Sequence, residues 1–135
     1  MAFVDWNEKY SVGIKDIDTQ HKRLFDLINE FYDSVKEGKV AAGTAKVIEG
    51  LLAYTVFHFG FEERLMEKHK YAGLGAQKVA HKAFTDKVAD YKDRVSTGKL
   101  LMTLEVTNYL KTWLTEHIMK SDMQYVPVLG AAGVH

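Results

Sequence analysis

The position of proline is the sequence feature that most constrains this chain, because Pro127 is the only proline among 135 residues. Proline interrupts a helix by removing an N–H donor and clashing with the preceding turn, so no helix upstream of Pro127 need break for that reason. Glycines supply the interruptions instead, and they divide the chain into segments of helical length at Gly38, Gly43, Gly73, Gly75 and Gly98. The sequence therefore predicts long helices joined by short loops.

The hydrophobic period places these helices at residues 18–37, 42–70, 76–96 and 100–121. In the first segment the inward positions alternate in steps of four and three, as one buried helix face requires, through Ile17, His21, Leu24, Ile28 and Phe31. Short loops between long amphipathic helices make neighbours antiparallel. We therefore expect an all-α fold: one domain over 1–135, with an N-terminal arm (1–17), an up-down-up-down four-helix bundle (18–121) and a C-terminal tail (122–135).

Charge and cysteine content exclude several classes of function. Lys and Arg number 18 against 18 Asp and Glu, so no basic field attracts nucleic acid or anionic lipid. The absence of Cys leaves imidazole and carboxylate as the strong metal ligands. The first residues lack a signal peptide's basic and apolar regions. In the body of the chain the longest stretch without Asp, Glu, Lys or Arg, Gly50–Phe61, is too short to span a bilayer. We expect a cytoplasmic monomer that neither inserts into membranes nor binds nucleic acid.

Polar residues occupy positions in the buried seam where Leu, Ile or Val would be ordinary. Burying any of them without a partner costs on the order of several kcal/mol. They come from all four predicted helices, and in two helices they form pairs four residues apart on one face; they are His21, His58, Glu62, Gln77, His81 and His117. Imidazoles gathered around a carboxylate inside a bundle are typical of a metal site.

Asp122 adds a second carboxylate to this set. It follows His117 by five residues, about 140° around an ideal helix, so the two side chains meet one centre only if they flank it or if the helix loosens there. Two carboxylates with four imidazoles are too many ligands for one metal ion and suit two. Ferritin-like proteins use Glu-x-x-His motifs, and no His of this chain has Glu three positions before it.

The pattern resembles the haemerythrins, in particular the bacterial ones, over essentially the whole chain. The elements that carry the resemblance are Asp18-Thr19-Gln20-His21, His58-x-x-x-Glu62, Tyr71, His81-x-x-Phe84, Trp113-Leu114 and His117-x-x-x-x-Asp122. The family is similar in fold to the bundle expected above. It binds dioxygen reversibly at a non-haem di-iron centre.

The resemblance implies a cofactor of two iron ions joined by an oxo or hydroxo bridge. Glu62 and Asp122 would bridge the ions, His21 and His58 would hold the ion that has an open position, and His81 and His117 would belong to the other. The apolar pocket implied for dioxygen consists of Leu24, Phe59, Trp113, Leu114 and Ile118. Storage, transport or sensing of dioxygen is the function expected, with an oxygen-consuming enzyme as a further partner and no enzymatic activity of its own.

One ligand position departs from the family pattern. The family has His-x-x-x-His on the third helix, whereas this chain reads Gln77-x-x-x-His81. Gln77 ligates weakly through its amide oxygen, or it stands aside for water. If the site tolerates the change, reversible dioxygen binding is retained. If both ions gain labile positions, an oxidase or peroxidase-like activity, or iron storage and detoxification, is the alternative.

Overall fold

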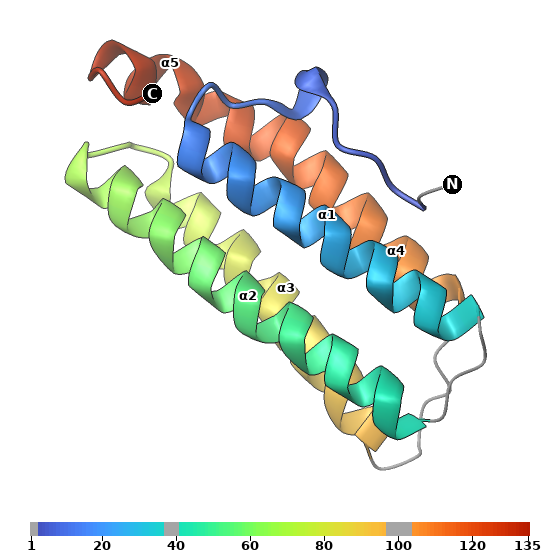
Figure 1. Ribbon diagram of the computed structural model, residues 1–135. Coiled ribbons are helices and arrows are strands. Elements are labelled where there is room, and N and C mark those ends of the chain that lie inside the picture. Colours follow the sequence, from blue (N-terminus) through green and yellow to red (C-terminus); the bar gives the residue numbers. More distant parts are fainter. Residues whose placement is uncertain (1–2, 37–40, 97–103) are drawn as a thin grey trace.

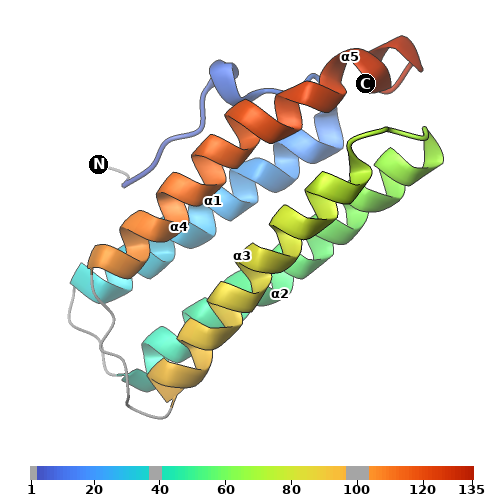
Figure 2. The same ribbon diagram turned by 180° about the vertical axis from the view of Figure 1, so that it is seen from behind.

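A computed structural model describes residues 3–36, 41–96 and 104–135, and four long helices make up most of it. They are α1 (Lys15–Lys36), α2 (Ala41–Lys68), α3 (Leu74–Ser96) and α4 (Leu104–Glu116). Figures 1 and 2 show that they run alternately up and down, with α1 beside α4 and α2 beside α3. The predicted all-α four-helix bundle is confirmed.

The periodic stripe identified in the sequence forms the interior of the bundle. All five inward positions of α1, from Ile17 to Phe31, are at most 2% exposed. The first three helices begin one to three residues before their predicted starts, and residues 37 and 100–103 of the predicted helices lie outside the described residues. Among the described helices, none combines the length and the apolar character needed to cross a bilayer.

The N-terminal arm lies over α1 and α4 (Figure 1). The backbone N–H of Val4 donates to Asn29 Oδ1 on α1, and Asn29 Nδ2 donates back to the Val4 carbonyl, both at 2.9 Å. Lys111 of α4 lies 4.8 Å from the centre of the Phe3 ring. After the short helix η1 (Glu8–Tyr10) the arm enters α1. Because these contacts join the arm to both α1 and α4, the arm covers the side of the bundle that these two helices form.

The C-terminal region differs from the predicted tail over 122–135. After α4 the chain widens into a π-helical turn, η2 (His117–Ser121), and continues as the 3-10 turn η3 (Asp122–Tyr125) and the helix α5 (Val126–Ala131). Tyr125 and Leu129 are completely buried, in a cluster with Val12, Ile14, Ile17 and Met66. The spacing of four residues places both side chains on one face of a helical segment that covers the end of the bundle.

Packing of α5 gives the first prediction. Leu129→Ala removes a fully buried side chain and should lower the free energy of unfolding by about 2–5 kcal/mol. Val128→Ala next to it, at a position 42% exposed, should change that free energy by less than about 0.5 kcal/mol. Urea unfolding of the metal-free protein measures both without a contribution from metal affinity. Equal values for the two variants would show that α5 is not part of the folded unit.

Candidate metal centre

The seven predicted ligands all lie in the interior, at the level where the four long helices face one another. None is more than 7% exposed. His21 comes from α1, His58 and Glu62 from α2, and Gln77 and His81 from α3. His117 begins η2 and Asp122 begins η3. Each bundle helix, or its direct continuation, therefore contributes at least one polar side chain to the same region.

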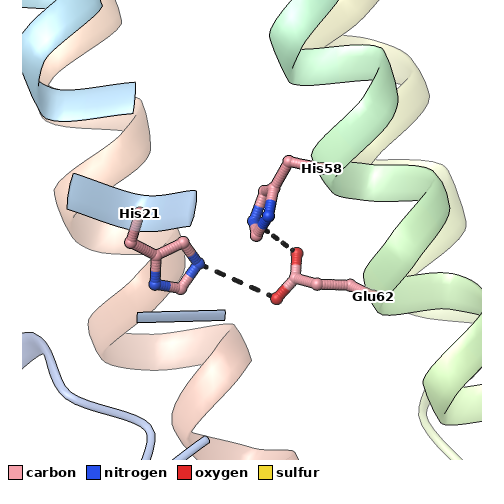
Figure 3. Close-up of side chains that lie close together, drawn as sticks. All are labelled: His21, His58 and Glu62. Carbon is pink, nitrogen blue, oxygen red and sulfur yellow. Dashed lines mark ion pairs between the residues drawn. The ribbon is translucent and has the colours of Figure 1, made fainter. Parts of the chain in front are cut away.

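The first group of potential ligands joins α1 to α2 and consists of His21, His58 and Glu62. Figure 3 shows the two imidazoles pointing toward the Glu62 carboxylate from opposite helices. His58 Nε2 lies 3.0 Å from Glu62 Oε1, and His21 Nε2 lies 3.8 Å from Glu62 Oε2. One ligand atom from each residue lies within 4.8 Å of the others, which is close enough for one metal ion to contact all three.

The second group joins α3 to the end of α4 and consists of His81, His117 and Asp122. The Nε2 atoms of His81 and His117 are 3.2 Å apart, and His117 Nε2 lies 3.2 Å from Asp122 Oδ1. The π turn makes this possible: the Asp122 N–H donates to the carbonyl of His117, five residues earlier. Of the two arrangements that the sequence left open, the helix loosens, and both side chains point inward.

The two carboxylates connect the groups. Glu62 Oε1, which faces His58, is also 3.6 Å from His81 Nε2 of the second group. Asp122 Oδ2 lies 3.4 Å from His21 Nε2 of the first group, while Asp122 Oδ1 faces His117. Each carboxylate thus touches imidazoles of both groups, which is the arrangement that a pair of bridging ligands requires.

Gln77 lies next to the second group, but its amide NH₂ faces the group. The amide oxygen, which is the atom able to bind a metal ion, does not. Its amide Nε2 donates to Asp122 Oδ1 at 3.1 Å, so the NH₂ side points to the carboxylate. Its carbonyl oxygen, Oε1, is buried and has no hydrogen-bond partner in the described chain. The position where the family pattern has an imidazole therefore holds a donor to Asp122 and an acceptor without a partner.

Two outer residues, Gln20 and Glu63, orient the imidazoles, and this role was not predicted from the sequence for either. Gln20 Oε1 lies 2.7 Å from His58 Nδ1, and Glu63 Oε2 lies 2.8 Å from His81 Nδ1. Both acceptors hold the proton of a neutral imidazole on Nδ1 and so turn the lone pair of Nε2 inward. Their direct sequence neighbours are the ligands His21 and Glu62, and this adjacency is the signal that could have identified them.

Tyr125 is a third residue that sequence reasoning missed. Its hydroxyl donates to Glu62 Oε2 at 2.6 Å, in the interior. Burial and the negative charges of Glu62 and Asp122 raise the pKa of Tyr125 well above its ordinary value, so the hydroxyl keeps its proton and remains a donor. It follows Asp122 by three residues, one helical turn, but a segment expected to be a tail gave no reason to turn it inward.

Burial and charge act against each other in the pKa values of the ligands. Burial lowers the pKa of His81 and outweighs the carboxylates around it, so this imidazole is neutral at pH 7. Burial also disfavours the charged form of His21, but the adjacent Asp122 and Glu62 outweigh it and raise the pKa of His21. Burial opposes ionisation of Asp122 too, yet contacts with His117 and His21 hold its pKa well below the ordinary value. Asp122 is therefore ionised at pH 7.

The hydrogen-bonding pattern of these residues fits a pair of cations. Five buried side-chain atoms among the predicted ligands have no hydrogen-bond partner within the described chain: His21 Nδ1 and Nε2, Glu62 Oε1, Gln77 Oε1 and Asp122 Oδ2. In addition, two hydrogen-bond acceptors face each other without a donor between them. The inward Nε2 of neutral His81 lies 3.6 Å from a carboxylate oxygen of Glu62. Cations between the inward-facing atoms of this set, His21 Nε2, Glu62 Oε1 and Asp122 Oδ2, would satisfy them, and nitrogen with oxygen donors suits iron.

The residues predicted to line the dioxygen pocket belong to one apolar cluster beside these groups. Leu24, Phe59, Leu114 and Ile118 are at most 4% exposed, and Trp113 is partly buried against them. The Phe59 ring stacks on His81 with ring centres 3.8 Å apart, and the Trp113 ring stacks on His117 at 4.5 Å. Apolar side chains therefore cover the imidazoles on this side.

Comparison with known proteins agrees with this architecture. Residues 12–129 match the family described as the Hemerythrin HHE cation binding domain. A bacteriohemerythrin of Pseudomonas aeruginosa is 40% identical over 93% of this chain and 81% of the relative. A hemerythrin of Siphonosoma cumanense is 34% identical over 89% of this chain and 88% of the relative. A solved structure of wild-type hemerythrin superposes with a TM-score of 0.90, at 30% identity, and covers 95% of this chain and 98% of its own.

Four helices in hemerythrin order, with two imidazole and carboxylate groups between them, define a cation-binding bundle. The chain belongs to the hemerythrin family.

The hydrogen bond from Tyr125 gives the second prediction. Tyr125→Phe removes the donor that orients Glu62, so the affinity for divalent metal should fall by about 10–100-fold. Competition between the protein and a chelator for Co²⁺ measures this affinity. Tyr109→Phe is the matched control, because burial alone accounts for the raised pKa of Tyr109 and its hydroxyl donates to no metal ligand. Unchanged affinity in Tyr125→Phe would show that Glu62 is held by other contacts.

Proposed function

We propose that this protein binds dioxygen reversibly at a non-haem di-iron centre inside the bundle, and that it serves storage, transport or sensing of dioxygen. The observation that carries the proposal is the pair of carboxylates, Glu62 and Asp122, each in contact with imidazoles of both groups. His21 and His58 would hold one iron, and His81 and His117 the other, with both carboxylates between them. Its relatives carry the names bacteriohemerythrin and hemerythrin.

Two ferrous ions in this site would supply the electrons that dioxygen takes up on binding and returns on release. The protein positions the metal ligands and shields the bound dioxygen from water. Gln20 and Glu63 fix the imidazoles of His58 and His81, and protonated Tyr125 holds Glu62. The apolar cluster of Leu24, Phe59, Trp113, Leu114 and Ile118 would keep water from the bound ligand, and among these five side chains the Trp113 indole N–H is the one hydrogen-bond donor. Few proton donors near the ligand favour its release unchanged.

The remaining parts of the proposal concern setting and partners. A cytoplasmic monomer is consistent with the equal numbers of basic and acidic residues. Dioxygen itself is uncharged, so its binding needs no charged surface. An oxygen-consuming enzyme would be the recipient of the carried molecule.

Iron content and visible absorption test the main proposal. We expect two iron ions per chain in protein purified from iron-replete cells. Exposure of the anaerobic diferrous protein to dioxygen should produce a visible absorption band that disappears when dioxygen is removed and returns when it is readmitted. One iron per chain, or oxidation without a reversible band, would contradict reversible dioxygen binding.

A second candidate function follows from Gln77, whose amide donates to Asp122 in place of a ligating imidazole. With a labile position at each ion, the centre would react with hydrogen peroxide, or its ferrous ions would be oxidised by dioxygen more readily than in the family pattern. If so, the protein should consume peroxide faster than the Gln77→His variant, and its dioxygen-bound form should decay faster. Both rates are measured on iron-loaded protein of equal metal content. Equal rates in the two proteins would remove this candidate.

A further inference from the structure

A small cavity lies beside Gln77, and its lining includes none of the five residues predicted to receive dioxygen. Its volume is about 130 Å³, and it is lined by Tyr71, Gly73, Ala76, Gln77, Ser121 and Gln124. Tyr71 and Gly73 lie in the turn before α3, Ala76 and Gln77 lie in its first turn, and Ser121 and Gln124 lie in the segment that follows α4. A water molecule occupies ~30 Å³ in the liquid, so the cavity has room for a molecule larger than one water.

Gln77 connects this cavity to the second group of ligands. It lines the cavity, and its Nε2 donates to Asp122 Oδ1, which lies 3.2 Å from His117 Nε2. The side chain is 4% exposed, and its Oε1 has no partner in the described chain. A buried acceptor without a partner is unfavourable, so this oxygen favours a donor brought by a ligand.

The uncharged lining of the cavity favours an uncharged ligand. None of the six lining residues carries a charged side chain. Beyond Gln77 stands the ionised Asp122, and a carboxylate next to a free carbonyl oxygen repels an anion. The cavity therefore favours a neutral molecule that has one N–H or O–H donor and one lone pair.

Gly73 contributes to the shape of this cavity. At position 73 an added Cβ would lie 2.6 Å from the Tyr71 ring, so the absence of a side chain lets that ring fold over the start of α3. Tyr71 in turn packs edge-on against Tyr125, with ring centres 6.3 Å apart. The wall of the cavity is thus part of the same packing that holds Glu62.

We propose that this cavity is a second ligand entrance, through which a small neutral nitrogen or oxygen donor of the imidazole class reaches the metal held by His81, His117 and Asp122. The inference rests on the proposed di-metal site. It assigns that metal an exchangeable ligand of its own, separate from the open position at the His21 and His58 group. The donor hydrogen of the ligand pairs with Gln77 Oε1, and water occupies the position when no other donor is present.

Imidazole is the probe, and Co²⁺-loaded protein is the reporter, because the visible spectrum of cobalt responds to a change of ligand without any turnover. Cobalt content per chain is measured first, and two ions are expected. Imidazole should then produce a saturable spectral change in the unaltered protein. Gln77→His, which supplies an imidazole covalently, should show the altered spectrum before any addition and should not respond further.

Variants of the cavity wall test the route of entry. Ala76→Leu places bulk in the cavity from an exposed position of α3 and should weaken imidazole binding by about tenfold or more. Ala83→Leu is the matched control: it makes the same change at an exposed position two turns along α3, and imidazole should bind as in the unaltered protein. Gln124→Trp narrows the cavity from the opposite wall and should weaken binding as Ala76→Leu does.

The outcomes separate this inference from the proposed function. With two cobalt ions bound, three results overturn the second entrance alone: no saturable response, equal imidazole affinity in Ala76→Leu and Ala83→Leu, or an undiminished response in Gln77→His. The last result would place imidazole at the His21 and His58 group. Fewer than two cobalt ions per chain would contradict the di-metal site and, with it, both proposals.

Discussion

Two carboxylates in the centre of an apolar bundle are the constraint on which the rest of this structure depends. Glu62 and Asp122 are no more than 1% exposed, and an uncompensated buried charge costs several kcal/mol. The imidazoles of His21 and His117 beside Asp122, and the phenol of Tyr125 on Glu62, compensate part of that cost. The inward-facing atoms still without partners, His21 Nε2, Glu62 Oε1 and Asp122 Oδ2, are those that a pair of cations would satisfy. Metal binding in such a site therefore adds directly to the stability of the fold.

The π turn after α4 shows how the backbone adapts to this constraint. In a regular α-helix His117 and Asp122 would point about 140° apart. Residues His117–Ser121 take a wider turn, and Asp122 joins the imidazoles at the centre. A π turn is uncommon and occurs frequently at functional sites. The same change of direction carries Tyr125 inward, so one irregular turn positions both a carboxylate and the hydroxyl that holds the other carboxylate.

The departure at Gln77 makes the two halves of the centre chemically different from each other. The first group, His21, His58 and Glu62, has every residue of the family pattern and is buried. The second has a glutamine amide bonded to Asp122 and a cavity beside Gln77. A site with this asymmetry has a buried, apolar approach on one side and a polar approach on the other. The balance between carrier and oxidant depends on the second approach, because a labile ligand exposes the metal to water and peroxide.

Much of the fold and most of the candidate site were predictable from the sequence, for a definite physical reason. Helical period determines which side chains share a face, so the inward positions of α1, the pair His58 and Glu62, and the pair Gln77 and His81 could be identified without a structure. Asp122 could be added but not placed, because helical geometry alone allowed two arrangements. The partners Gln20 and Glu63 were missed, since each lies beside a ligand in sequence and only the packing of helices turns it toward an imidazole.

The sequence by itself determined the helices, the face that each buries and the chemical types gathered there, because these depend on local period and composition. Tertiary structure alone decided which side chains meet. It divided the ligands into two groups, placed each carboxylate in contact with both, and packed α5 so that Tyr125 reaches Glu62. These outcomes depend on how distant helices are rotated against one another, and no pattern within a single helix encodes that rotation.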